Sequence, residues 1–110
     1  MKVDTHINIQ KGLAKLKDSG KLFLEVFNHG SLSAELYKPE KVDLQQPHTE
    51  DEVYVVISGH GIFVNEGQET RFDPGDFPFV KAGAGHRFID FSEDFVTWVF
   101  FYGPEGGENK

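Results

Sequence analysis

Eight short strand-like segments follow one another between Leu22 and Tyr102, and turn residues separate each from the next. Aliphatic and aromatic residues fill the segments, while glycine, proline, aspartate, asparagine and serine occupy the gaps. The predicted strands cover about residues 22–28, 31–37, 52–58, 61–65, 69–72, 77–81, 86–91 and 95–102. Short strands at this spacing are typical of antiparallel barrels. The sequence therefore predicts an all-β, jelly-roll barrel.

A short amphipathic segment precedes the strands. Ile9, Leu13 and Leu16 recur at helical spacing, and the run Asp18-Ser19-Gly20 is a typical helix stop. These features predict an N-terminal helix over about residues 9–17.

The length of the chain limits its organisation. With 110 residues the chain is large enough for one hydrophobic core and too small for a second. We therefore expect a single domain over residues 1–110, with the barrel at about 22–102. The polar, glycine-rich residues 103–110 are expected to form a flexible tail.

Charge and composition exclude several classes of partner. The formal net charge of −7 opposes nucleic-acid phosphates and anionic membranes, and no basic stripe offsets it. The apolar stretch from Phe95 to Tyr102 is too short to span a bilayer, and the first residues do not lead into a signal-like segment. The chain has no cysteine, so any transition metal must be held by nitrogen and oxygen. We expect a cytoplasmic protein that binds neither nucleic acid nor membrane.

Two histidines and a glutamate lie where predicted strands begin. Three residues separate His48 from Glu52 at the start of one strand, and His86 follows a glycine-rich turn at the start of another. Strand ends of a barrel can direct such side chains to one point. Imidazole nitrogens and carboxylate oxygens are common ligands of divalent transition metals. The spacing therefore predicts a metal site at His48, Glu52 and His86.

These residues resemble the two motifs of the cupin superfamily, G-x5-H-x-H-x(3,4)-E-x6-G and G-x5-P-x-G-x2-H-x3-N. The positions in register are His48, Glu52 and Gly59 for the first motif and Gly75, Gly83 and His86 for the second. The departures are Glu40, Gln46, Lys81 and Asp90, which replace a glycine, a histidine, a proline and an asparagine. The resemblance implies a double-stranded β-helix (jelly-roll) barrel like that of the small, single-domain bacterial cupins of the conserved-barrel type.

The resemblance also implies a ligand set with one weak member. Gln46 stands where the family has its first histidine, so an amide oxygen replaces a nitrogen donor. The predicted ligands are Gln46, His48, Glu52 and His86. Iron, manganese, nickel, copper and zinc all accept such ligands, and the sequence does not choose among them. The alternative is a metal-free polar cluster of the same side chains.

Strand alternation places further side chains near these ligands. Tyr54 follows Glu52 on one face, and its hydroxyl is a candidate to contact substrate. Asp90 follows His86 on one face. It is a candidate base or a candidate orienting group for a ligand imidazole, and the alternative is a solvated carboxylate at the end of the strand. Alternation also predicts Phe79 and Phe88 in the interior. The acidic residues expected on a solvated loop are Glu40, Asp43, Glu50 and Asp51.

Two predicted strands, 52–58 and 95–102, are apolar on both faces. If Glu52 points inward, then Val53 and Val55 lie on the opposite face. A sheet that is apolar on both sides needs cover from the helix or from a second copy. This pattern predicts a homodimer.

Two classes of function fit these features. The first is a metalloenzyme in which the ion polarises a small, oxygen-rich substrate such as an enediol, keto acid or catechol, or activates dioxygen beside it. The reaction could be that of a dioxygenase, isomerase, decarboxylase or lyase, and the sequence ranks none of them. The second is a non-catalytic module that binds a small sugar or carboxylic acid.

Overall fold

The computed structural model describes residues 6–43 and 45–109, which form one helix and eight strands. In chain order the elements are α1 (Ile9–Ser19), β1 (Phe23–His29), β2 (Leu32–Tyr37), β3 (Asp51–Ser58), β4 (Gly61–Asn65), β5 (Gln68–Phe72), β6 (Phe79–Val80), β7 (His86–Ile89) and β8 (Val96–Tyr102). Each predicted strand and the predicted helix therefore exists, with ends that differ by up to two residues.

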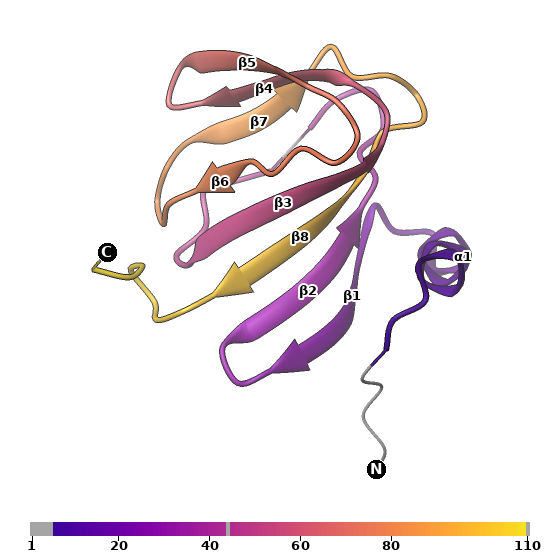
Figure 1. Cartoon of the computed structure of the whole chain (residues 1–110), viewed down its shortest axis with the longest axis horizontal. Helices are drawn as coiled ribbons and strands as arrows, with labels where there is room; N and C mark the ends of the chain where they lie inside the picture. The colour runs from indigo at the N-terminus through magenta and orange to yellow at the C-terminus, as the bar shows by residue number, and fades with distance from the viewer. Residues whose placement is uncertain (1–5, 44, 110) are drawn as a thin grey trace.

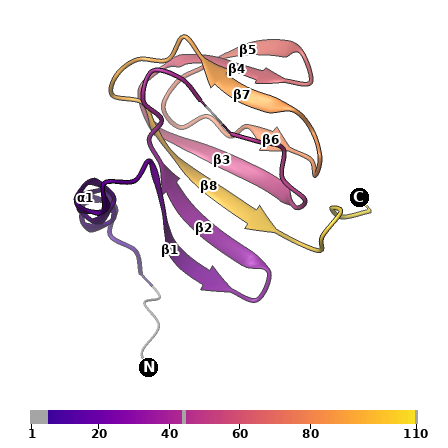
Figure 2. The same ribbon diagram turned by 180° about the vertical axis from the view of Figure 1, so that it is seen from behind.

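The strands form two antiparallel sheets that face each other (Figure 1). The larger sheet has the order β1-β2-β8-β3-β6, and the smaller has the order β5-β4-β7. Figure 2 shows the smaller sheet on the side of the molecule away from β1. Strands β3 and β8 are distant in sequence and pair along their length, as a jelly roll requires. The predicted all-β jelly-roll fold is confirmed.

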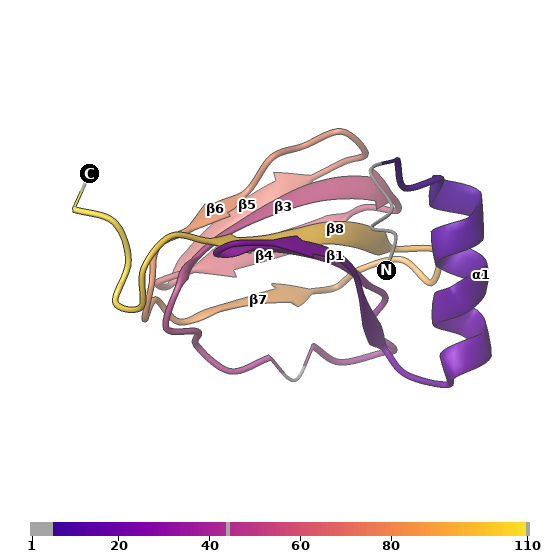
Figure 3. The same cartoon turned by 90° about the horizontal axis from the view of Figure 1, so that it is seen from below.

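Helix α1 packs beside the β1–β2 end of the larger sheet (Figure 3). It begins where the Asn8 side chain accepts a hydrogen bond from the Lys11 backbone N–H, and it ends at Gly20 in a left-handed conformation. Gly12 lies against Leu36, and a Cβ there would come within 2.8 Å of the Leu36 methyl group. In the described part of the chain, no helix is long and apolar enough to cross a membrane.

Aromatic side chains fill the space between the sheets. Phe88 lies at the centre, with ring centroids 4.9 Å from Tyr54, 5.3 Å from Phe72 and 4.7 Å from Phe95. Edge-to-face and tilted packing of this kind stabilises a core beyond simple burial. The predicted interior position of Phe88 is confirmed, because only 1% of it is exposed.

Strand alternation holds on β3 but not on β6. Glu52 and Tyr54 are fully buried on the inner face of β3, as predicted. Phe79 was expected inside, but it pairs with Val53 on the outer face and is 47% exposed. Val80 takes the inner position opposite Glu52. The expectation for Phe79 is therefore wrong, because β6 is only two residues long and its register comes from pairing with β3 rather than from residues upstream.

Candidate metal centre

Three side chains from separate segments converge at one end of the barrel. His48 comes from the connection between β2 and β3, Glu52 from β3, and His86 from the first position of β7. Each offers a ligand atom, and these atoms lie within 4.8 Å of one another. The structure thus brings together three of the four predicted ligands, with His86 coming from a strand distant in sequence from the other two.

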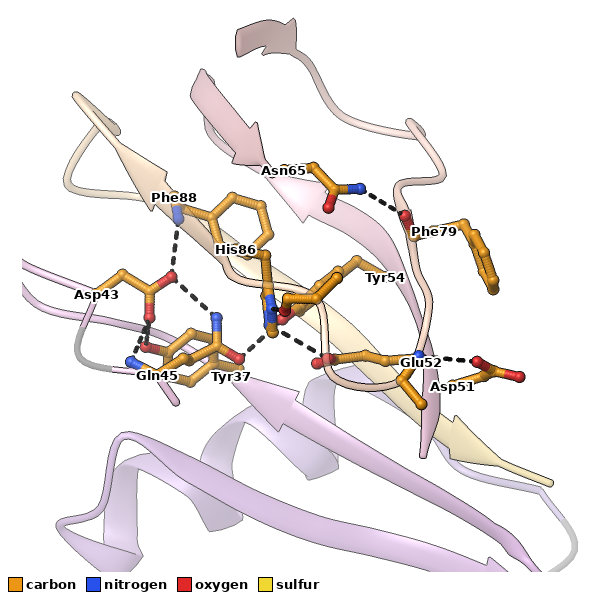
Figure 4. Close-up of polar contacts among 12 residues, drawn as sticks. Tyr37, Asp43, Gln45, Asp51, Glu52, Tyr54, Asn65, Phe79, His86 and Phe88 are labelled. Carbon is orange, nitrogen blue, oxygen red and sulfur yellow. Dashed lines mark hydrogen bonds and ion pairs between the residues drawn. The ribbon is translucent and has the colours of Figure 1, made fainter. Parts of the chain in front are cut away.

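The ring of His86 is held in one orientation. Its Nδ1 lies 2.9 Å from the backbone carbonyl oxygen of Ala84, which can only accept, so Nδ1 carries the hydrogen. A histidine fixed in this way presents Nε2 to the site, as metal-binding histidines commonly do. Nε2 lies 3.2 Å from Oε1 of Glu52 (Figure 4).

His48 is positioned by its backbone and by an aromatic neighbour. Its carbonyl oxygen accepts a hydrogen bond from the Gly83 N–H at 2.7 Å, which ties the His48 segment to the turn before His86. Gly83 has φ of 81°, a left-handed conformation that suits glycine. The ring of Phe101 on β8 lies edge-on to the His48 ring, with centroids 4.7 Å apart.

Glu52 and His86 leave buried polar atoms without partners. Both carboxylate oxygens of Glu52 and Nε2 of His86 are buried and make no hydrogen bond with any described residue. The 3.2 Å contact between them lacks hydrogen-bond alignment. A carboxylate and a neutral imidazole nitrogen are both acceptors, so each needs a cation or a proton between them. A divalent metal ion meets that need, and the residues fit it.

A proton is the competing partner for these atoms. Burial alone would lower the pKa of His86, but the Glu52 carboxylate and the Ala84 carbonyl favour the imidazolium more strongly, so the pKa is raised. Protonated His86 beside Glu52 corresponds to the metal-free polar cluster that the sequence left as an alternative.

A hydrogen-bonded network supports the centre from one side (Figure 4). The Tyr54 hydroxyl donates to Oε1 of Gln45 at 2.8 Å, and the Gln45 amide donates to Asp43 at 2.9 Å. Asp43 also accepts from the Tyr37 hydroxyl at 2.6 Å and from the Phe88 N–H at 2.8 Å. The network links the β2–β3 connection to both sheets.

This network corrects one expectation and adds two residues. Asp43 was expected on a solvated loop but is 7% exposed, because partners from β2 and β7 enclose it. Sequence reasoning missed Gln45, since no motif marks it, and missed the role of Asp43 for the same reason.

Burial and the negative charge of Glu52 raise the pKa of Tyr54 well above its usual value, so its hydroxyl remains a donor.

Two predicted site residues are exposed, unlike Glu52 and His86. Gln46 is exposed. It lines a cavity that His86 also lines, together with Gln45, Glu66 and Arg87. Asp90 is exposed and follows the last residue of β7, with a left-handed backbone at φ 51°. Because β7 ends at Ile89, the strand alternation that predicted Asp90 on one face with His86 does not extend to it.

Asp51 anchors the C-terminal segment next to the centre. It was expected to be solvated but is 5% exposed, because its carboxylate accepts from the backbone N–H groups of Ala82 and Glu108. These two hydrogen bonds lower the pKa of Asp51. A further hydrogen bond runs from the Gly106 N–H to the Thr49 carbonyl oxygen. The segment after β8 therefore contacts the part of the β2–β3 connection that carries His48, Thr49 and Glu50, called the ligand loop below.

A cavity of about 420 Å³ adjoins the cluster on the inner face of the larger sheet. Its lining residues are Phe23, Ser33, Glu35, Tyr37, Gln45, His48, Glu50, Val99 and Phe101. His48 belongs to both the cluster and the cavity wall. A small molecule in this cavity would therefore contact His48, one of the three candidate metal ligands.

Comparison with known proteins places the chain among small β-barrel proteins. A family model described as "Cupin domain" matches residues 34–102. The uncharacterized protein SCO3923 of Streptomyces coelicolor is 34% identical over 85 residues, which cover 76% of this chain and 81% of that protein. Acireductone dioxygenase of Bacillus mycoides is 48% identical over 46 residues, or 37% of this chain. That match spans only 27% of the dioxygenase.

Solved structures show the same fold at low sequence identity. KdgF from Halomonas sp. aligns with a TM-score of 0.64 and 20% identity over 74% of this chain and 78% of that one. Protein NMB1881 from Neisseria meningitidis aligns with a TM-score of 0.69 and 19% identity, over 89% and 99% of the two chains. At these identities the likeness establishes the barrel and its topology.

Proposed function

The chain belongs to the cupin family, and on that premise we propose that it is a metal-dependent cupin whose divalent transition-metal ion is held by His48, Glu52 and His86. The identity of the ion stays open among iron, manganese, nickel, copper and zinc. Gln46 is a weaker candidate for a fourth ligand because its side chain is exposed.

The unpartnered Glu52 carboxylate carries this proposal. A buried carboxylate without hydrogen bonds is strongly destabilising unless a positive charge compensates it. The family's ligand spacing and the fixed ring of His86 support a metal ion as the compensating charge. Nothing else among the described residues offers a cation to Glu52 apart from protonated His86.

The residues of the chain divide the remaining tasks. A bound divalent ion supplies Lewis acidity toward an oxygen-rich substrate. Phe101 and Val99 give the cavity apolar walls, and Phe101 also fixes the ring of His48. The Tyr54 hydroxyl donates a hydrogen bond to Gln45, which lines the cavity. The proposed role of Tyr54 is therefore to position the Gln45 amide beside the cavity.

Relatives that are named as dioxygenases indicate one class of reaction to test. Acireductone dioxygenases of several Bacillus strains match a short part of this chain. We infer from this likeness that a dioxygenase is one reaction to test first, with consumption of dioxygen in the iron-loaded protein as the measurement. Isomerase and lyase reactions remain part of the same proposal.

Metal analysis of the purified protein tests the proposal. The protein is prepared without affinity-tag metal, and its metal content is measured beside that of the double variant His48→Ala, His86→Ala. We expect near-stoichiometric metal in the wild type. The double variant should lose roughly nine-tenths or more of it, because Glu52 would be the one ligand of the three that remains. A variant at His29, which is exposed on a hairpin, serves as control and should keep its metal.

Metal that persists in the double variant would show a different site. A wild type that refuses iron, manganese, nickel, copper and zinc would leave the second candidate, a cupin that binds a sugar or carboxylic acid without turnover. The exposure of Asp90 beyond the end of β7 supports this second candidate, since an exposed carboxylate is less suited to act as the predicted acid–base group. A ligand that raises the melting temperature and is recovered unchanged would support it.

A further inference from the structure

The cavity beside the cluster has one carboxylate that no other feature explains. Glu35 lies on the inner face of β2, opposite Val99 on β8, and Val99 is opposite Tyr54 on β3. The Glu35 and Tyr54 backbones are thus two strands apart, or roughly 10 Å. Glu35 therefore shares the inner face of the larger sheet with Glu52 and lines the same cavity as His48.

Glu35 has no partner within the described residues. Its half-buried carboxylate makes no hydrogen bond or ion pair with any described residue, whereas neighbouring Glu25 accepts a hydrogen bond from the Ser33 hydroxyl at 2.8 Å. Glu25 stands directly opposite Glu35 in the β1–β2 pair. Like charges at directly opposed positions destabilise a sheet. The ionised form of Glu35 is therefore energetically unfavourable in the folded protein, and no described neighbour compensates its charge.

The surroundings of Glu35 favour its neutral form. Desolvation by burial, followed by the charges of Glu25 and Glu52, raises its pKa. A positive charge placed in the cavity would relieve both the burial and the repulsion. A second negative charge there would increase them.

No lysine or arginine lines this cavity in the part of the chain that the structure describes. Its two acidic residues are Glu35 on β2 and Glu50 on the ligand loop, and the whole chain carries a net charge of −7. The apolar side chains of Phe23, Val99 and Phe101 limit the water that could screen these charges.

We propose that Glu35 is a specificity-determining residue of the metal pocket, selecting substrates whose end away from the metal carries a positively charged nitrogen and rejecting those with a second anionic group there. This inference rests on the proposed function, since His48, a candidate metal ligand, lines the same pocket as Glu35. It narrows the substrate class from any oxygen-rich compound to small chelating amines.

Three catechols with one chelating head and different tails test the inference. Dopamine carries an ammonium group, 4-ethylcatechol is neutral, and dihydrocaffeate carries a carboxylate. Each is titrated under nitrogen into the zinc-loaded protein by calorimetry, because zinc avoids redox chemistry. We expect dopamine to bind about fivefold more tightly than 4-ethylcatechol and dihydrocaffeate about fivefold more weakly, as for a partly screened charge pair.

Glu35→Gln keeps the shape of the side chain and removes its charge, so the three affinities should then agree within about twofold. Glu69→Gln, on an exposed position of β5, is the matched control and should keep the wild-type order. Zinc content is measured in each variant first.

The outcomes separate this inference from the metal site. Zinc-loaded wild type that binds all three catechols equally, or none of them, overturns the role of Glu35 and leaves the metal site standing. The same holds if Glu35→Gln keeps the preference for dopamine. A wild type that takes up no zinc overturns the proposed function and this inference together.

Discussion

Individual carboxylates in this protein differ mainly in what surrounds them. Asp43 and Asp51 are buried and each accepts several hydrogen bonds, so they act as structural anchors. Glu52 is buried without such bonds and lies beside His86. Glu35 is half-buried and unpartnered in the described chain. The anchors have their bonds, whereas Glu52 has only the His86 imidazole beside it and Glu35 has no partner among the described residues.

Glu35→Gln should stabilise the metal-free protein above its raised pKa. In the folded state the pKa of Glu35 lies above its usual value of 4.5, so ionisation disfavours the fold as pH rises. Below pH 4.5 Glu35 is neutral in both the folded and unfolded states and the variant gains nothing. Toward pH 7 we expect a gain of about 0.5 kcal/mol, or about 2 to 4 °C in melting temperature, after discounting for solvent screening.

Thermal melts with a chelator present, at pH 4 and pH 7, measure this difference. Glu69→Gln controls for the loss of one negative charge from an acidic chain. An equal gain at both pH values would contradict the assigned cause, because a pH-independent effect cannot come from ionisation of Glu35.

At the scale of elements, the turn after β3 lies in close contact with the segment before β8. Gly59 ends β3 with φ of 88°, and its α-carbon lies against the backbone of Phe95 before β8. A Cβ there would come within 2.7 Å of the Phe95 backbone nitrogen, a contact that no side-chain movement relieves. The family motif requires glycine at this position, and the fold gives the steric reason.

Gly59→Ala should therefore destabilise the protein by more than about 3 kcal/mol, since it combines a left-handed backbone with overpacking. Gly67→Ala is the matched control, because Gly67 has a similar φ of 82° but open space around it. The control should lose about 1 kcal/mol, the cost of the left-handed conformation alone. Denaturant unfolding measures both, and equal losses would show that contact with Phe95 is unimportant.

The whole molecule leaves an apolar surface on the outer face of its larger sheet. Phe79, Val53 and Phe100 lie in one cross-strand row, and Val55 and Trp98 lie in the next. Helix α1 packs against β1 and β2, where Gly12 lies against Leu36, so it covers the other end of this face. The apolar surface supports the predicted homodimer, which stays a prediction, as does the cytoplasmic location.

Val55→Glu should convert the dimer into a monomer. A charge in the middle of this surface would lose its hydration on association, which disfavours the contact by several kcal/mol. Light scattering with gel filtration gives the mass, for which we expect twice 12.4 kDa in the wild type and 12.4 kDa in the variant. Thr70→Glu, on the exposed face of β5, should remain dimeric. A monomeric wild type would remove this prediction.

The sequence by itself determined the eight strands, the helix and the convergence of His48, Glu52 and His86. Alternation, glycine turns and capping residues are local signals, and the ligand spacing follows from strand ends. Only the tertiary structure decided what depends on pairing between distant segments. The register of β6 turned Phe79 outward, and partners from β2 and β7 buried Asp43. The β2–β8–β3 order placed Glu35 on the same sheet face as Glu52. Cross-strand neighbours are fixed by the topology of the sheet, and no local pattern encodes them.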